Sequence, residues 1–105
     1  MNRLSPDLVE RLTKLKKQYQ TEGFVILGVF GSVARSEETP DSDIDLLYQV
    51  EASFFSRNHG FDAFTRLEAI KQEMKTALCR KVDLAPKNTV NRILNQEIER
   101  DIIYV

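Results

Sequence analysis

Apolar and polar positions alternate with a helical period over three stretches of the chain. From Pro6 to about Gly23 apolar residues recur every three or four positions, after an N-cap residue, Ser5, and a proline at the first helical position. Residues 62–78 and residues 88–100 repeat this spacing. The pattern therefore predicts three amphipathic helices, with apolar positions at Leu8, Leu12, Leu15 and Tyr19, then Ala63, Leu67, Ile70, Met74 and Ala77, then Val90, Leu94 and Ile98.

Shorter and more continuous apolar runs predict strands between these helices. Residues 24–30, FVILGVF, are too few for a buried helix and indicate a central strand covered on both faces. Residues 43–50, 80–86 and 101–105 predict three further strands, the third strand of the chain being closed by Pro86. We expect residues 31–38 to turn into a short helix that ends before Pro40, and the pattern assigns no element to residues 51–60.

Alternation of strands with helices indicates an α/β (α+β) domain built around a small mixed β-sheet flanked by helices. With 105 residues, 42% of them hydrophobic, the chain should form one modest core in a single domain over residues 1–105, without a second substrate-binding domain. The net charge near −1 argues against the broad basic face that duplex DNA binding needs. Because no run approaches about 20 apolar residues and the N-terminus is charged, we expect a cytoplasmic protein with no membrane contact.

The single cysteine and the single histidine add little chemistry. Cys79 has no partner for an internal disulfide, and the chain holds no Cys/His cluster that predicts a zinc site. We expect Cys79 to be a buried residue at a helix end, and His59 to be an exposed polar residue of a loop.

The chemistry is concentrated in two aspartates at the head of a predicted strand. Asp43 and Asp45 are two positions apart and should project from the same face, while Ile44 and Leu46 point the other way into the core. Paired carboxylates repel each other, and a divalent cation with hard oxygen ligands is the usual compensation. Magnesium suits this pair better than calcium, because the segment lacks the glycine and terminal glutamate of a calcium loop, and better than zinc, because no imidazole or thiolate accompanies it.

A third aspartate and a Gly-Ser pair extend this pattern. Asp83 lies among apolar residues of a predicted strand, and three aspartates on neighbouring strands can hold two metal ions about 3.5–4 Å apart for phosphoryl or nucleotidyl transfer. Asp83 would also take the proton of the attacking hydroxyl. Gly31 and Ser32 end the first strand before a predicted helix, where backbone N–H groups bind phosphate, and Arg35 is a further candidate phosphate contact.

Each of these features has an ordinary structural interpretation when taken alone. A Gly-Ser pair before a helix is commonly a plain turn, an Asp-x-Asp is commonly a cap, and Arg35 and Asp83 fit surface positions. The conjunction is what favours nucleotidyl or phosphoryl transfer, because one mechanism requires all of these parts. Lys71, Glu73 and Lys75 are interpreted as surface residues of the second long helix.

The spacing Gly31-Ser32, ten residues, Asp43-x-Asp45, followed by a strand aspartate, resembles the signature of the DNA polymerase β-like nucleotidyltransferase superfamily. The segment GSVARSEETPDSDIDLL is similar to the minimal nucleotidyltransferases, or MNT proteins, of that superfamily. The resemblance implies a nucleotidyltransferase fold and magnesium-dependent transfer of a nucleoside monophosphate from ATP. Its implied catalytic and metal-binding residues are Asp43, Asp45 and Asp83, and its implied nucleotide-binding residues are Gly31, Ser32 and Arg35.

The resemblance also implies a partner protein. Many minimal members are antitoxins paired with a HEPN toxin, a ribonuclease, and some neutralise it by adding AMP to a toxin tyrosine, so a hetero-oligomer is implied. The chain departs from the family pattern at Ser36, where the family has a glycine. A serine in a left-handed turn would cost about 1 kcal/mol, which affects local geometry rather than activity.

Three other interpretations remain open. The domain could be a catalytically vestigial antitoxin that blocks its partner by docking alone, or a transferase for a small molecule such as an aminoglycoside. Modification of its own Tyr19, Tyr48 or Tyr104 ranks below these. We expect four phenylalanines to be buried in the domain's own core rather than to form an interface patch: Phe54, Phe55, Phe61 and Phe64.

Overall fold

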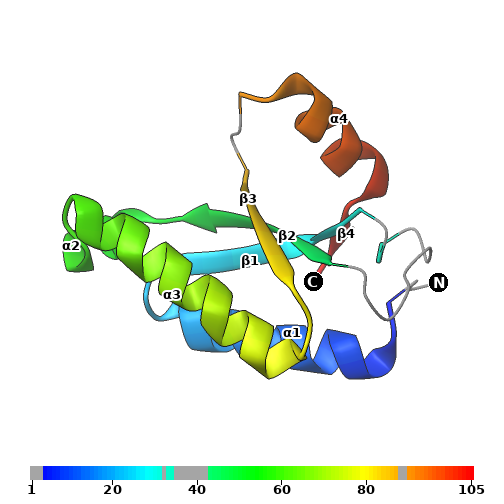
Figure 1. The fold of residues 1–105 in the computed structure, drawn as a ribbon, viewed down its shortest axis with the longest axis horizontal. Coiled ribbons are helices and arrows are strands. Elements are labelled where there is room, and N and C mark those ends of the chain that lie inside the picture. The colour runs from blue at the N-terminus through cyan, green and yellow to red at the C-terminus, as the bar shows by residue number, and fades with distance from the viewer. Residues whose placement is uncertain (1–3, 32, 35–42, 88–89) are drawn as a thin grey trace.

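The computed structural model describes residues 4–31, 33–34, 43–87 and 90–105. A four-stranded sheet in the order β3-β2-β1-β4 forms its centre, with α1 and α3 over one face and α4 over the other (Figure 1). In chain order the elements are α1 (Pro6–Gln20), β1 (Phe24–Phe30), β2 (Ile44–Val50), α2 (Ala52–Arg57), α3 (Phe61–Leu78), β3 (Val82–Pro86), α4 (Arg92–Asp101) and β4 (Ile103–Tyr104).

The sheet is mixed, as the sequence predicts. β1 pairs antiparallel with β2 and with β4, whereas β2 and β3 run parallel. A parallel pair needs a crossover connection, and α2 with α3 supplies it. The prediction of an α/β domain with a small mixed sheet and flanking helices is confirmed.

The three predicted amphipathic helices are present, and local capping sets where α1 and α4 begin. The short helix predicted over residues 31–38 lies mostly outside the described residues. The Ser5 side chain accepts a hydrogen bond from the Leu8 backbone N–H at 3.2 Å, which fixes the start of α1. α4 begins later than predicted, at Arg92, because the Asn91 side chain caps it by accepting from the Leu94 N–H at 3.1 Å. Val90 therefore precedes the helix and is 98% exposed, so its assignment to the apolar helix face is wrong.

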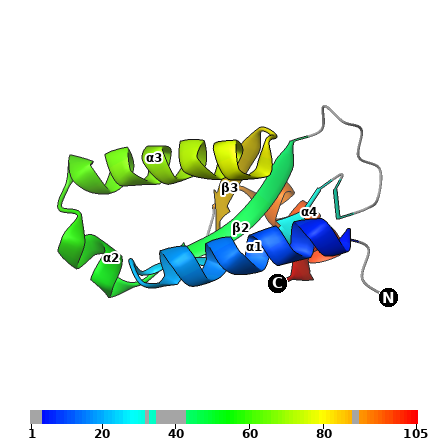
Figure 2. The ribbon, with the colours of Figure 1, turned by 90° about the horizontal axis from the view of Figure 1, so that it is seen from below.

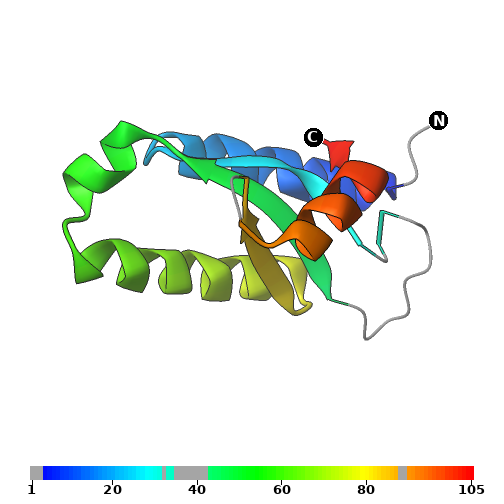
Figure 3. The same cartoon turned by 90° about the horizontal axis from the view of Figure 1, so that it is seen from above.

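Two hydrophobic cores lie on opposite faces of the sheet. Figure 2 and Figure 3 show the helices that cover these faces, from below and above. The larger core packs α1 and α3 against β1 and β2, and the smaller one packs α4 against the other face. β1 contributes to both, which confirms that residues 24–30 form a central strand covered on both faces. The smaller core consists of Phe30, Leu47, Ala85 and Ile98, with Leu27, Leu94 and Ile102 packed against it.

A register shift in β1 decides which of its residues reach which core. Ile26 pairs with Tyr48, but Gly28 pairs with Leu47, so Leu27 is an extra residue in the β1–β2 ladder. Beyond this bulge Val29 faces the larger core and Phe30 faces the smaller one. The bulge thus sets the orientation of the strand end that leads into the candidate site.

Two predictions about burial are wrong. Cys79 is exposed, because α3 ends there in a left-handed turn with φ of 56° that carries the residue past the last contact with the sheet. Phe54 is fully buried, but Phe55, Phe61 and Phe64 are exposed, Phe61 by 91%. A six-residue helix and the first turns of the next one offer a single face to the core, so their other faces are left to solvent.

His59 is exposed, as predicted, in the turn that joins α2 to α3. In the described ranges no helix is both long and apolar enough to cross a lipid bilayer.

Candidate active site

Gly31 lies directly against the carboxylate of Asp45. β1 ends at Phe30, which pairs with Asp45 on β2, and Gly31 turns the chain with φ of 78°. A Cβ added to Gly31 would collide with Asp45 Oδ2, so a side chain at position 31 is excluded both by space and by backbone angle. The glycine at the end of β1 therefore brings bare backbone next to a candidate catalytic carboxylate.

Asp45 and Asp83 are partners in the parallel β2–β3 ladder. Residues that pair in register point to the same face of a sheet, so the two carboxylates share one face. Asp43 precedes β2 by one residue and is half-buried. Ile44 and Leu46 are fully buried in the larger core, as the sequence predicts. The structure thus brings Gly31 and all three predicted aspartates to one end of the sheet.

The structure does not describe the two other predicted nucleotide-binding residues. Ser32 and Arg35 lie outside the described residues, as does Ser36, the position that departs from the family pattern. Val33 and Ala34, between them, are buried in the larger core. The turn after β1 is therefore held against the α1–α3 face by apolar contacts.

The aspartates offer the donor chemistry that magnesium prefers. All three supply hard carboxylate oxygens, and the absent side chain of Gly31 is what allows the Asp45 carboxylate to lie against the backbone at the end of β1. Asp83 Oδ1 lies 3.9 Å from Lys71 Nζ. Across the described part of the chain, no three acidic, histidine or cysteine side chains are gathered closely enough to hold a metal ion. The donor set fits a magnesium ion, although the three carboxylates are not drawn together as ligands.

A hollow of about 170 Å³ opens beside Asp43 and Asp83 and is lined by three lysines. Two of them, Lys71 and Lys75, were interpreted from the sequence as surface residues, and Lys81 was not singled out. Lys71 and Lys75 come from successive turns of α3, and Lys81 precedes β3 by one residue. Two signals in the sequence point to this cluster: the i, i+4 spacing of the helical lysines and the position of Lys81 two residues before Asp83.

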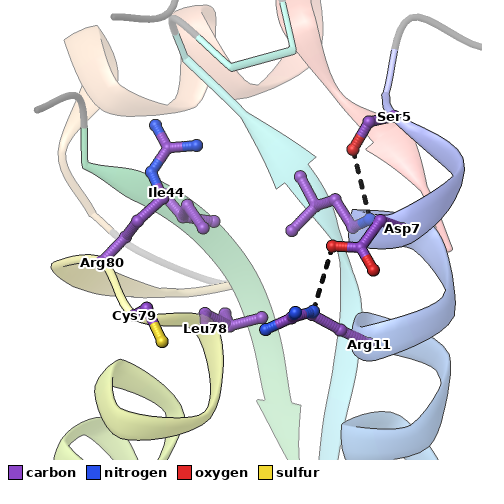
Figure 4. A pocket seen from close by; sticks show the side chains of 8 residues that line it. Ser5, Asp7, Arg11, Ile44, Leu78, Cys79 and Arg80 are labelled. Atoms are coloured by element: carbon purple, nitrogen blue, oxygen red, sulfur yellow. Dashed lines mark hydrogen bonds and ion pairs between the residues drawn. The ribbon is translucent and has the colours of Figure 1, made fainter. Parts of the chain in front are cut away.

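A larger hollow of about 360 Å³ lies elsewhere, between the start of α1 and the end of α3 (Figure 4). Arg11 spans it: its Nε lies 3.0 Å from Asp7 Oδ2, and its Nη1 donates to the Ala77 carbonyl oxygen at 3.2 Å. Ile44 lines this hollow from the sheet face opposite to Asp45. The hollow is therefore separate from the carboxylates, and Arg11 serves to tie the two helices together.

The strongest electrostatic network in the described residues joins α1 to α3 away from the aspartates. Arg66 donates two hydrogen bonds of 2.8 Å to the Glu22 carboxylate and a third of 2.8 Å to Glu73, which also accepts from the Tyr19 hydroxyl at 2.7 Å. The hydrogen bond from Arg66 lowers the pKa of Glu22, and the hydrogen bond from Tyr19 lowers the pKa of Glu73. Burial, followed by the Glu73 contact, raises the pKa of the Tyr19 phenol.

The sequence analysis also missed one buried carboxylate, Asp101 at the end of α4. It is 3% exposed, and Arg100 Nε donates to it at 3.1 Å.

Of the three tyrosines considered for self-modification, Tyr19 is buried and Tyr104 lies on the short strand β4, in agreement with the helix and strand positions that the sequence predicts for them.

Comparison with known proteins identifies the fold and the family. The family model described as nucleotidyltransferase domain matches residues 7–104. A Methanocaldococcus jannaschii protein provisionally named protein adenylyltransferase MJ1379 is 33% identical over 92 residues, which cover 87% of this chain and 83% of that protein.

Two solved structures share the fold. A minimal nucleotidyltransferase, 27% identical, superposes with a TM-score of 0.70, and the match covers 100% of this chain and 97% of that chain. A chain of a toxin–antitoxin crystal structure with AMP-PNP, 21% identical, superposes with a TM-score of 0.65 over 90% of this chain and 69% of its own.

Proposed function

Because this chain belongs to the nucleotidyltransferase domain family, as a minimal nucleotidyltransferase, we propose that it is an antitoxin that neutralises a HEPN-type ribonuclease toxin by magnesium-dependent transfer of AMP from ATP to a toxin tyrosine. One observation supports the proposal. A side-chain-free glycine, Gly31, lies against Asp45, and Asp45 pairs in register with Asp83, so these three residues, to which we assign phosphate binding and the reaction, share one end of the sheet.

In the reaction, the tyrosine oxygen forms a bond to the α-phosphorus of ATP, and the bond between that phosphorus and the β-phosphate bridging oxygen breaks. Pyrophosphate leaves, and Asp83 takes the proton from the hydroxyl. Asp43, Asp45 and Asp83 would hold magnesium, which neutralises charge that develops on the phosphate oxygens. The proposed phosphate contacts are the backbone of Gly31 and the predicted residues Ser32 and Arg35.

The protein acceptor and the toxin partner are supported by the named relatives. The M. jannaschii relative bears the name of a protein adenylyltransferase, and one structural neighbour is a toxin–antitoxin complex with an ATP analogue. The architecture also favours an acceptor that arrives on another molecule, because the described elements form one sheet with its flanking helices around the candidate site. ATP as donor is consistent with a cytoplasmic reaction.

The intact mass of the co-purified partner, measured after incubation with magnesium and ATP, tests this function. Wild type should add increments of AMP, whereas Asp45→Asn, Asp83→Asn and Asp43→Asn should each lower the rate by at least about a hundredfold, because each variant removes a charged oxygen ligand at the reacting centre. Asp62→Asn is the matched control: this exposed aspartate lies in the first turn of α3, and its loss should leave the rate unchanged.

The same experiment separates catalysis from docking. Exposed Phe55, Phe61 and Phe64 give a vestigial antitoxin a plausible contact surface, so this second function has an observation in its favour. A partner that stays unmodified by wild type, yet is inhibited equally by wild type and by Asp45→Asn, would replace the transfer proposal with docking.

A further inference from the structure

The lysine hollow beside Asp83 occupies a defined side of the candidate site. In the sheet order β3-β2-β1, Asp45 on β2 lies between Gly31 at the end of β1 and Asp83 on β3. The proposed nucleotide contacts follow β1, whereas the hollow is lined from α3 and β3. The hollow therefore lies across the carboxylates from the nucleotide, where the attacking group has to arrive.

Most of the positive charge in this hollow is not neutralised by the other described residues. Lys71 Nζ lies 3.9 Å from Asp83 Oδ1, a weak contact that leaves most of its charge available. Within the described residues, neither Lys75 nor Lys81 forms a side-chain ion pair or hydrogen bond, whereas Lys14, Arg11 and other cations on the same fold are paired. The hollow of about 170 Å³ is lined by three ammonium groups and by the Asp43 and Asp83 carboxylates. Because those two carboxylates are proposed to hold magnesium, the lysines leave a field that favours an anion.

The hollow has room beyond a single group. It shares Lys71 with a neighbouring hollow of about 220 Å³ that runs along α3 and is lined by Tyr48, Phe64 and Leu84 among others. An acceptor segment of a protein can therefore extend past the lysines without leaving the surface. Figure 2 and Figure 3 show the C-terminal end of α3 beside β3, the two elements whose residues line the lysine hollow.

We propose that Lys71, Lys75 and Lys81 form an anion subsite on the acceptor side, which binds a carboxylate or phosphate group next to the hydroxyl that receives the nucleotide. This inference rests on the proposed transfer function and assigns its acceptor a chemistry: an oxyanion within a few ångströms of the reacting oxygen. Two sources supply such a group, an acidic side chain of the partner or the phosphodiester of a nucleotide already attached.

A binding measurement tests the subsite without requiring transfer. With the nucleotide site saturated by AMP-PNP and magnesium, inorganic phosphate should shift the backbone amide NMR signals of Lys75 and Lys81 in wild type, while those of Lys17 on α1 stay in place. The double variant Lys75→Gln/Lys81→Gln should bind phosphate at least about fivefold more weakly, and the exposed Lys17→Gln should match wild type. Absence of the shift in wild type, or equal affinity in the double variant, would overturn the subsite.

A transfer measurement then identifies the source of the anion. If the double variant slows the first AMP increment on the partner, the anion is an acidic group of the partner, whereas slowing of later increments alone points to the attached phosphodiester. If the double variant adds every increment at the wild-type rate, the acceptor role is overturned. The same holds if a rise in the KM for ATP accounts for the whole loss of rate in the double variant. If wild type adds no increment, the transfer function is refuted. The phosphate titration then still decides whether the subsite exists.

Discussion

At the scale of single residues, Gly31 has the most specific requirement in the candidate site. Its φ of 78° lies in the left-handed region that L-residues rarely adopt, and its absent side chain leaves the space occupied by the Asp45 carboxylate. The effect of the backbone angle can be separated from the effect of the Asp45 contact by comparison with Gly60. Gly60 also has a positive φ, 58°, but an added Cβ there would face open space.

Gly31→Ala and Gly60→Ala therefore form a matched pair. Both should lose about 1 kcal/mol of unfolding free energy to backbone strain, measured by urea denaturation. Only Gly31→Ala should also displace Asp45, and we expect it to lower the rate of AMP transfer by at least about tenfold. Equal transfer rates in the two variants would show that the position of the Asp45 carboxylate does not matter for the reaction.

At the scale of elements, the Arg66 network holds α3 against the end of α1. Arg66 lies on α3, Glu22 follows α1, and Glu73 joins Arg66 to the buried Tyr19 of α1. The Arg66 and Glu22 side chains are 26% and 23% exposed, so solvent screens this pair less than an ordinary surface pair.

The stability supplied by this network should depend on pH. Both glutamates have a pKa lowered from 4.5 in the folded state, so the unfolded chain binds more protons between the folded and unfolded pKa values. Their stabilisation is fully present above the unfolded pKa of 4.5 and is lost as the pH falls through the lower folded values.

Arg66→Met should lower the unfolding free energy by about 1–2 kcal/mol at pH 7, because Glu22 loses both hydrogen bonds from Arg66 and Glu73 keeps only the one from Tyr19. The difference from wild type should shrink as the pH falls below 4.5, in denaturation curves recorded at several pH values. Glu68→Gln, on an exposed position of α3, is the control and should differ little from wild type at any pH. A constant difference across the pH range would contradict this account.

At the scale of the whole molecule, the two cores differ in size. The core shared by α1, α3 and the sheet contains most of the buried apolar side chains described, whereas the α4 face depends on Phe30, Leu47, Ala85 and Ile98. The small core under α4 gives that helix a low local free energy of opening. β4 follows it directly and pairs with β1 at only two residues, although Ile103 also packs against the larger core.

Ile98→Ala should therefore act locally, with a cost of about 2–4 kcal/mol for the lost side-chain packing. Hydrogen exchange should show faster exchange of amides in α4 and β4, with α1 and α3 less affected. Leu12→Ala, in the larger core, is the comparison and should lower protection in all elements. An equal loss of protection across the molecule in Ile98→Ala would mean that the two cores open together.

Several features were predictable from the sequence because short-range physics decides them. The start of α1 follows from Ser5 and Pro6, and the face alternation of Asp45 against Ile44 and Leu46 follows from the pleat of a strand. The two-sided burial of β1 follows from its unbroken apolar run. Gly31, Asp43 and Asp45 were visible for the same reason, since they lie at the end of one strand and the start of the next along the chain.

The tertiary structure decided what depends on segments far apart in the chain. The pairing of Asp45 with Asp83 requires the β2–β3 register, and the lysine hollow requires α3 to lie beside β3. Exposure of Cys79 and Phe61 depends on where the helices leave the sheet. A sequence pattern reports which side of its own element a residue occupies, but which other element covers that side is set by long-range packing.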